Sequence, residues 1–198
     1  MKSIDSLVEK VLELKKNGLS EGEISDELHL SVATVTWLLT RNVKEEKPPT
    51  DIKVGWRSIG VYGSRIRLIS SLFIDVILEE VEKRDIEKVD TVVGIAINGI
   101  PFATMVAEDL GLELSIYRPP VSDDGKGTFS SNYATLKGKN VVVVDDVIST
   151  GHVAKSTIAD LKTEGANPLL IVVMVNKTPL YELDSVPLRS LIRARTIA

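Results

Sequence analysis

The sequence predicts an α/β protein in which helices flank a parallel sheet on both faces, preceded by a small all-α domain. Two patterns support this fold class. After about residue 60, apolar blocks of strand length alternate with segments of helical periodicity, which is typical of a parallel sheet covered on both sides. Before about residue 45, apolar residues recur only at helical spacing. A chain of 198 residues is long enough for one full domain and one small one.

Composition excludes several kinds of site. Apolar residues make up 43% of the chain and charged residues 26%, which is ordinary for a globular protein. With no cysteine and two histidines, thiolate chemistry is excluded and a metal ligated directly by the protein is not expected. The formal net charge of −4 gives no general attraction to nucleic acid, so any DNA contact has to be local. The absence of a signal-peptide pattern and of a membrane-length apolar run predicts a cytoplasmic protein without a membrane partner.

Three short helices are predicted at the N-terminus. The first stops at Asn17-Gly18, a pair suited to a left-handed cap. Ser20 and Glu23 have capping-box spacing at the start of the second, and Ser31 caps the third. The residues expected to face the core are Ile4, Leu7, Val8, Val11, Leu12 and Leu14, then Ile24 and Leu28, then Val32, Val35, Leu38 and Leu39.

The second and third of these helices have the layout of a helix-turn-helix and resemble the DNA-binding domains of many prokaryotic regulators. In that form the third helix enters the major groove. The segment from residue 31 to residue 40 holds no acidic residue, which favours a DNA contact there. The candidate DNA-binding residues are Ser31, Ala33, Thr34, Thr36, Trp37 and Arg41, with Lys44 near a phosphate. The alternative is a helical bundle that dimerises or covers the edge of the sheet.

A charged stretch with two adjacent prolines, Pro48 and Pro49, separates the two parts of the chain. Paired prolines favour an extended, semi-rigid connector. We therefore predict a helix-turn-helix domain over residues 1–44, a linker over 45–58 and an α/β domain over 59–198.

The α/β domain is expected to begin with a long helix over residues 64–83. Its inward residues are predicted to be Ile66, Ile69, Leu72, Phe73, Val76, Ile77 and Val81. The elements expected after it are a strand at 91–97, a helix at 100–110, strands at 114–118 and 140–147, a helix at 153–164 and a strand at 169–175.

The most informative segment is a buried strand that ends in two carboxylates and runs through a small-residue turn into a helix. Asp145 and Asp146 end the strand, and Ser149-Thr150-Gly151 forms the turn. Ligands of open α/β sheets bind at this edge. Backbone N–H groups, hydroxyls and a helix N-terminus suit a phosphate monoester, and the carboxylates can accept hydrogen bonds from ribose hydroxyls. The implied ligand is a sugar phosphate.

This segment resembles the phosphoribosyl-pyrophosphate (PRPP) signature of the type I phosphoribosyltransferases. The resemblance implies the fold of that family, with Asp145 and Asp146 on the ribose hydroxyls and with Mg²⁺ carried by PRPP rather than ligated by the protein. It also implies a short loop, Asn98-Gly99, at the pyrophosphate. The residues implied around the 5′-phosphate are Ser149, Thr150, Gly151, His152 and Val153. Arg118 is implied at the pyrophosphate, and Lys177 is a candidate for the base site.

The polar stretch over residues 119–133 departs from the orotate branch of this family. In that branch the corresponding loop is a basic lid with a catalytic lysine and a histidine. Here Lys126 is the one catalytic candidate, and it follows Asp123 and Asp124. Carboxylates oppose the negative charge that develops on a leaving pyrophosphate, so PRPP binding is expected without efficient transfer.

Three functions remain open at this stage. The first is a DNA-binding regulator of sugar or nucleotide metabolism that senses PRPP or a related phosphate, as in archaeal regulators related to orotate phosphoribosyltransferase, which share this domain order. Such a regulator is expected to be a C₂ homodimer that reads two half-sites. The second is an active orotate or purine phosphoribosyltransferase. The third is a dimeric interaction module without a ligand.

Overall fold

The computed structural model describes residues 4–40, 49–120 and 125–196, and the chain forms two compact units. We call residues 4–55 the N-terminal unit and residues 56–194 the C-terminal unit. The division between Gly55 and Trp56 falls inside the segment expected to be the linker.

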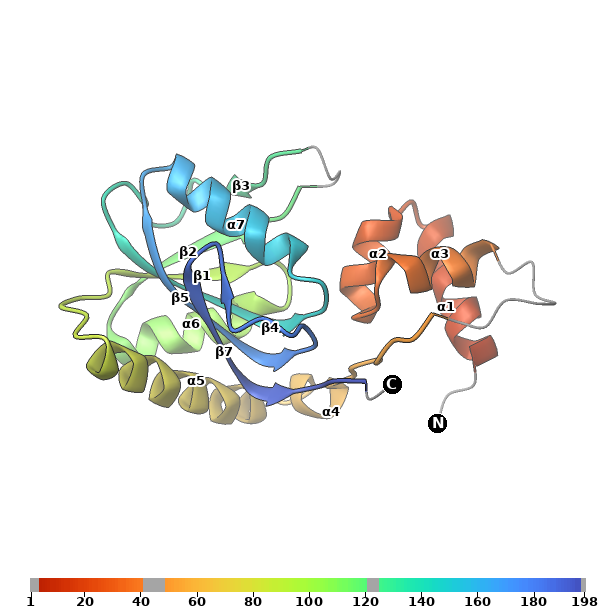
Figure 1. Cartoon of the computed structure of the whole chain (residues 1–198), viewed down its shortest axis with the longest axis horizontal. Coiled ribbons are helices and arrows are strands. Elements are labelled where there is room, and N and C mark those ends of the chain that lie inside the picture. The colour runs from red at the N-terminus through yellow and green to blue at the C-terminus, as the bar shows by residue number, and fades with distance from the viewer. Residues whose placement is uncertain (1–3, 41–48, 121–124, 197–198) are drawn as a thin grey trace. The chain divides into compact units, whose positions relative to one another are not determined.

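The N-terminal unit contains three helices, α1 (Ile4–Lys16), α2 (Glu21–Leu28) and α3 (Val32–Thr40) (Figure 1). Gly18 after α1 has φ +92°, as the cap expected there requires. The predicted capping box of α2 is present, with the Ser20 hydroxyl accepting from the Glu23 N–H and the Glu23 carboxylate accepting from the Ser20 N–H. The core of the unit consists of Val11, Ile24, Leu28, Leu30, Val35 and Leu38.

Three residues predicted to face this core are instead exposed: Ile4 (49%), Leu12 (50%) and Val32 (45%). A unit of three short helices buries only one narrow stripe of each helix. Apolar residues at the sides of the stripe and at the helix ends therefore stay in contact with solvent.

The C-terminal unit is built on a seven-stranded sheet in the order β3-β2-β1-β4-β5-β7-β6. Its five inner strands run parallel, and the short edge strands β3 and β6 are antiparallel to their neighbours. The strands are β1 (Thr91–Ile95), β2 (Glu113–Arg118), β3 (Thr128–Phe129), β4 (Asn140–Ile148), β5 (Asn167–Asn176), β6 (Glu182–Leu183) and β7 (Val186–Arg193).

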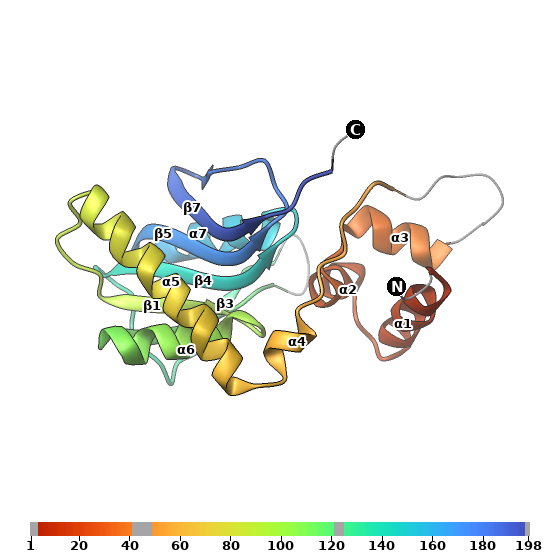
Figure 2. The ribbon, with the colours of Figure 1, turned by 90° about the horizontal axis from the view of Figure 1, so that it is seen from below.

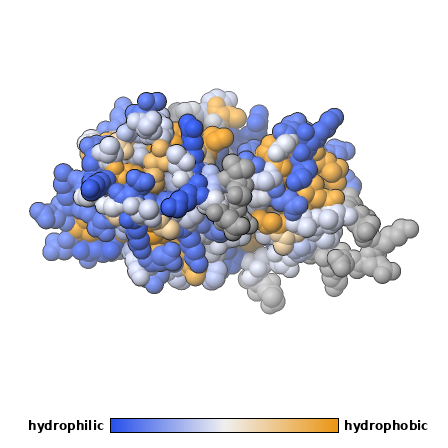
Figure 3. All heavy atoms as spheres, turned by 90° about the horizontal axis from the view of Figure 1, so that it is seen from above, coloured by the Kyte–Doolittle hydropathy of each residue, from blue (hydrophilic) through white to orange (hydrophobic). Residues whose placement is uncertain are grey.

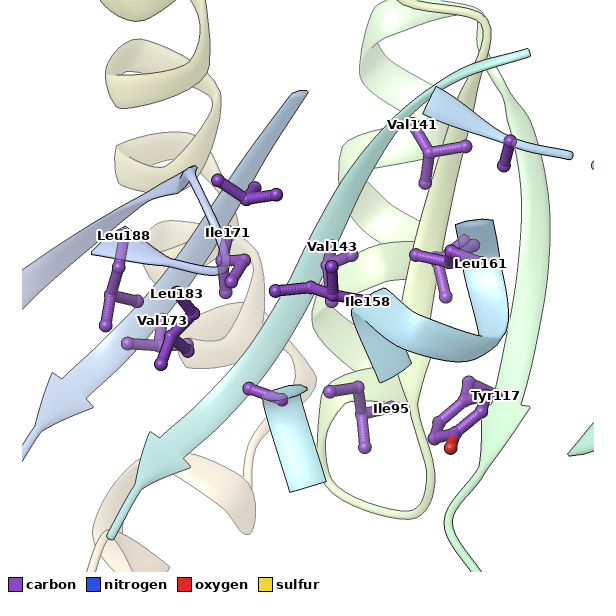
Figure 4. Packing of buried hydrophobic residues seen from close by; sticks show 14 of the residues in the cluster. Ile95, Tyr117, Val141, Val143, Ile158, Leu161, Ile171, Val173, Leu183 and Leu188 are labelled. Carbon is purple, nitrogen blue, oxygen red and sulfur yellow. The ribbon is translucent and has the colours of Figure 1, made fainter. Parts of the chain in front are cut away.

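Helices cover both faces of this sheet, as the apolar strands require. Figures 1 and 2 show α5 (Gly63–Lys83) and α6 (Gly99–Leu110) on one face and α7 (His152–Thr163) on the other. A single turn, α4 (Arg57–Gly60), precedes α5. On the α7 face, Ile158 and Leu161 pack on alternate residues of the strands, including Val143 and Ile171 (Figure 4). The α/β prediction with a parallel sheet is confirmed.

The structure differs from the predicted elements in several respects, and α4, β3 and β6 have no predicted counterpart. Strand β1 ends at Ile95 rather than at residue 97, because the chain turns there into α6. Leu72 is 50% exposed, since it lies on the outer side of α5. The last parallel strand, β7, was not predicted, because Pro187, Arg189 and Arg193 interrupt its apolar residues.

No helix in the described ranges is long and apolar enough to cross a membrane. On the face shown in Figure 3, hydrophilic and hydrophobic residues are interspersed.

Candidate functional site

The strand order brings the two predicted ligand loops together. β1 and β4 are parallel neighbours, so their carboxyl ends lie at the same edge of the sheet. The loop after β1 packs directly on the end of β4, because a Cβ added to Gly99 would lie 2.5 Å from the Val144 carbonyl oxygen and 3.1 Å from Asp145 Oδ1. Only glycine allows this close approach. The Asn98-Gly99 loop and the acidic strand end therefore form one site.

The two carboxylates at the end of β4 have different surroundings. Asp145 is partly buried, and its Oδ1 accepts the Asp146 N–H at 2.9 Å. Asp146 is 3% exposed, and its Oδ2 accepts the indole N–H of Trp56 at 2.5 Å. The contact with Trp56 spans 90 positions in the chain, and no local sequence pattern indicates it.

The turn after β4 leads into α7 as predicted. Gly151 has φ +84°, a left-handed conformation that favours glycine, and it directly precedes the first residue of α7. The His152 N–H donates to the Thr150 hydroxyl at 3.3 Å, while the Ser149, Thr150 and His152 side chains are partly or largely exposed. Val153, in the first turn of α7, is partly buried against the core. Hydroxyls and the first N–H groups of α7 are thus grouped beside the acidic strand end, as an anion site requires.

The base-site candidate Lys177 lies next to this turn, because its N–H donates to the Ile148 carbonyl at 2.9 Å. Asn176, directly before it, is buried and organises the following turn: its Oδ1 accepts from the N–H and the hydroxyl of Thr178, and its Nδ2 donates to the Leu180 carbonyl. The structure therefore gives Asn176 a structural role and leaves the side chain of Lys177 half-buried at the sheet edge.

The polar loop after β2 is attached at its far end to α7. Arg118 ends β2 with an exposed side chain and pairs with Thr128 of β3. Lys126 is exposed, and Asp123 and Asp124 lie outside the described residues. The Gly127 N–H and the Tyr117 hydroxyl both donate to Asp160 Oδ2 of α7, at 2.9 and 2.8 Å. The end of the loop is therefore fixed to the helix that begins directly after the Ser149-Thr150-Gly151 turn.

Burial raises the pKa of Tyr117 to about 12, and its hydrogen bond to Asp160 and the charge of that carboxylate add to the effect. Unfolded tyrosine titrates near its ordinary value of about 10. The neutral phenol therefore contributes stability that is complete below pH 10 and is lost as the pH rises from 10 to 12.

We expect the free energy of unfolding of the wild type to fall as the pH rises through that window. Its slope should be steeper than that of Tyr117→Phe by up to about 1.4 kcal/mol per pH unit. Urea unfolding of both proteins at pH 9, 10 and 11 measures the difference. Equal slopes in the two proteins would contradict the assignment.

The helical candidates for DNA contact fall into two groups. Ser31 and Thr34 face inward: the Ser31 N–H and the Thr34 hydroxyl donate to Asp51 Oδ2 at 2.7 and 2.8 Å, and Thr34 is 7% exposed. The expectation that Thr34 faces a groove is therefore corrected. Asp51, which was assigned to the linker, holds the start of α3 in place.

The other group lies on the outer side of α3. Ala33 and Thr36 are exposed and Trp37 is half-buried, and these residues occupy one side of the helix with Thr40. The Thr36 hydroxyl donates to Glu21 of α2, so an acidic side chain borders this surface although the α3 segment itself has none. Arg41 and Lys44 lie outside the described residues. We call Ala33, Thr36, Trp37 and Thr40 the outer α3 surface.

Within the described ranges, no group of three or more His, Asp or Glu side chains is arranged to hold a metal ion. Asp145 and Asp146 are a pair of oxygen donors, the type that Mg²⁺ prefers. They fit an ion that arrives with a phosphate ligand and keeps most of its own coordination.

Comparison with known proteins places both parts of the chain. Residues 66–191 match the family described as the phosphoribosyl transferase domain. Among solved structures, orotate phosphoribosyltransferase from Aeropyrum pernix superposes with a TM-score of 0.55 at 23% identity, covering 76% of this chain and 84% of that one. Adenine phosphoribosyltransferase from Rhodothermus marinus also gives 0.55, at 20% identity and over 75% and 89% of the two chains. At these identities the likeness concerns the fold.

Similarity to curated proteins extends over the whole chain. The transcriptional regulator GfcR of Thermoplasma acidophilum is 50% identical over 197 residues, covering 100% of this chain and 98% of the relative. The transcriptional regulator GfcR 2 of Methanosarcina barkeri is 46% identical over 198 residues, covering 98% of each. The α/β unit with its PRPP-type loops, the N-terminal helices and the full-length identity agree: this chain belongs to the GfcR family of archaeal transcriptional regulators, and its C-terminal unit is a phosphoribosyl transferase domain of the type I fold.

Proposed function

We propose that this regulator binds operator DNA through α2 and α3, used as a helix-turn-helix, and binds PRPP or a related sugar or nucleotide phosphate at the carboxyl edge of its sheet. The observation that carries the proposal is the packing of Gly99 on Val144 and Asp145. This contact brings the pyrophosphate-type loop, the acidic pair and the phosphate turn into one site. The names of the full-length relatives support regulation as the output.

The site offers one group for each part of PRPP. Asp145 and Asp146 provide acceptors for the ribose hydroxyls, and the turn from Ser149 to His152 provides hydroxyls and helix N-terminal N–H groups for the 5′-phosphate. The backbone at Asn98 and Gly99 would face the pyrophosphate, and Asp145 and Asp146 would provide oxygen donors for a Mg²⁺ ion that arrives with it. Sugar or nucleotide metabolism is the corresponding class of controlled genes, because PRPP joins these two pools.

On the DNA side, the outer α3 surface is the part that would enter the major groove. Its side chains are small or aromatic, and their hydroxyl and apolar groups suit base edges and thymine methyl groups. The helix–DNA contact is local, as the net charge of −4 requires.

A reciprocal pair of variants tests this division of labour. Ala33→Glu places a carboxylate on the outer α3 surface without disturbing the helix, and we expect at least about tenfold weaker binding to DNA from upstream of the gene, with PRPP binding unchanged. Asp145→Asn keeps Oδ1 for the Asp146 N–H but removes the charge, and we expect weaker PRPP binding with unchanged DNA affinity in the absence of PRPP.

Fluorescence anisotropy on DNA and calorimetry with PRPP and Mg²⁺, both at one stated salt concentration, measure the two affinities. Leu12→Glu adds the same charge at an exposed site on α1 and is the control for Ala33→Glu. If the two glutamate variants weaken DNA binding equally, α3 is not the reading helix.

Phosphoribosyl transfer is the second candidate, favoured by the fold alone. Departure of pyrophosphate requires cations that close over the developing charge. The described cations near the loop, Arg118 and Lys126, are exposed, and Lys126 follows Asp123 and Asp124 in sequence. We therefore propose binding without turnover, and a pyrophosphate-release assay with orotate and with purine bases distinguishes the two candidates.

We also propose that the protein acts as a homodimer paired through the outer side of α5. That side exposes Leu68 (67%) and Leu72 (50%), with Arg65 one turn before them and Asp75 one turn after. In an antiparallel pair of α5 helices centred near Ser70, Leu68 of one copy meets Leu72 of the other and Arg65 meets Asp75. The face is thus complementary to itself in both charge and apolar groups.

Charge reversal tests this pairing. Asp75→Arg sets two cations against each other at both ends of the pair and is expected to weaken dimerisation at least about tenfold. The double variant Arg65→Asp/Asp75→Arg restores opposite charges and should restore the dimer. Light scattering during gel filtration at several protein concentrations follows the change. A wild-type monomer, or a dimer indifferent to both variants, would exclude this interface.

A further inference from the structure

Trp56 contacts the candidate ligand site through Asp146, although neither the sequence pattern nor the family comparison assigns it a role. Its indole N–H donates to Asp146 Oδ2 at 2.5 Å, and Asp146 is 3% exposed. The indole ring packs against Phe102 of α6 with ring centroids 5.6 Å apart, and Phe102 packs in the same way on Phe73 of α5. The Phe102 and Phe73 rings are fully buried. Trp56 is therefore held in a defined position against one of the two carboxylates.

This hydrogen bond occupies the carboxylate that the ribose hydroxyls of PRPP would use. An indole N–H and a ribose hydroxyl are both hydrogen-bond donors that fit a carboxylate oxygen. A buried carboxylate without a partner is costly, so Trp56 stabilises Asp146 when no ligand is present. Because Asp146 is 3% exposed, there is little room for a second donor at this oxygen while the indole is bound to it.

The chain on the other side of Trp56 leads directly to the start of α3. Asp51, five positions earlier, accepts from the Ser31 N–H and the Thr34 hydroxyl at the first turn of α3. Five residues span at most about 18 Å when extended, so the segment that joins these two residues is short.

We propose that Trp56 is the residue through which the ligand acts on DNA binding. In the ligand-free protein the indole holds Asp146. The ribose hydroxyls of PRPP displace it, and residues 51–56 transmit the displacement to the first turn of α3. This inference rests on the proposed function, since it requires PRPP at the acidic strand end. It assigns the regulation of that site to one hydrogen bond, and linkage requires that DNA and PRPP alter each other's affinity by the same factor.

The two tryptophans of the chain make the proposal directly measurable, because Trp37 lies on α3 and Trp56 lies at the ligand site. In Trp37→Phe the fluorescence comes from Trp56 alone. Displacement from a partly buried, carboxylate-bonded position into water shifts tryptophan emission to longer wavelength. We expect this shift to saturate with PRPP and Mg²⁺ at the affinity that calorimetry gives for the same protein. This experiment leaves the site itself intact.

A variant of Trp56 supplies the second measurement. Trp56→Phe keeps an aromatic ring against Phe102 but has no N–H donor, so PRPP no longer competes for Asp146. We expect PRPP to bind about tenfold more tightly than to Trp37→Phe, the loss of one hydrogen bond to a charged group. We also expect PRPP to leave the DNA affinity of Trp56→Phe unchanged while it alters that of the wild type. Circular dichroism and thermal unfolding establish that the variant is folded.

The outcomes separate this inference from the proposed function. If calorimetry detects no PRPP binding to Trp37→Phe, the proposed ligand is wrong. If PRPP binds but Trp56 emission does not shift, or Trp56→Phe retains the full response of DNA affinity to PRPP, then the ligand site stands and the role of Trp56 is refuted.

Discussion

Replacing Gly99 by alanine is expected to lower the free energy of unfolding of the C-terminal unit by about 3 kcal/mol and to remove PRPP binding. The added Cβ would lie 2.5 Å from the Val144 carbonyl oxygen and 3.2 Å from Asp145 Cα, and backbone atoms cannot rotate out of the way. Either α6 or the end of β4 has to move, and both carry ligand groups. Stability and binding are therefore expected to fall together.

Urea unfolding followed by Trp56 emission in the Trp37→Phe background reports on the C-terminal unit alone. Gly63→Ala is the matched control, because Gly63 begins α5 and a Cβ there meets nothing within 4 Å. If Gly99→Ala binds PRPP as the control does, the loop and the strand end do not form a joint site.

Replacing Arg189 by methionine is expected to cost about 3 kcal/mol of stability, because it leaves a buried carboxylate without its charged partner. Arg189 of β7 donates to Glu80 of α5 through Nε at 2.7 Å, and the Glu80 side chain is 6% exposed, whereas that of Arg189 is 37% exposed. The cost arises mainly from the carboxylate that remains.

The double variant Glu80→Met/Arg189→Met removes both charges and keeps similar volumes, so its stability is expected to lie within about 1 kcal/mol of the wild type. The same urea assay compares the three proteins. A single variant as stable as the double one would mean that water, rather than Arg189, satisfies Glu80.

Local sequence pattern was sufficient to predict most of the long helices and strands and the turn that joins β4 to α7. The apolar blocks predicted four strands of the sheet, and the structure contains the predicted succession of strand, acidic pair, small-residue turn and helix. Phosphate binding at that turn stays a prediction. Capping rules placed the start of α2 correctly, since they depend on residues three positions apart.

The features that sequence reasoning missed depend on distant contacts. Trp56 is 90 positions from Asp146, and Asp51 is 17 positions from Thr34. In the sequence, Trp56 and Asp51 look like ordinary linker residues, because their partners are distant along the chain. Strand β7 was not predicted because its arginines suggest a solvated segment. One of them, Arg189, instead pairs with the buried Glu80 of α5. Thr34 is predicted from the sequence to face outward because its hydrogen-bond acceptor, Asp51, lies beyond Pro48 and Pro49 in the chain.

The position of Asp51 also determines which residues a stable N-terminal unit has to include. Pro48 and Pro49 suggest a domain boundary in the sequence. The carboxylate that accepts hydrogen bonds from the first turn of α3, however, belongs to Asp51, which follows them. A piece cut at the prolines would lose that cap, worth about 1 kcal/mol in so small a fold. The N-terminal unit therefore extends past the prolines to Gly55. A gene fusion that joined this unit to another ligand-binding domain would have to include these residues.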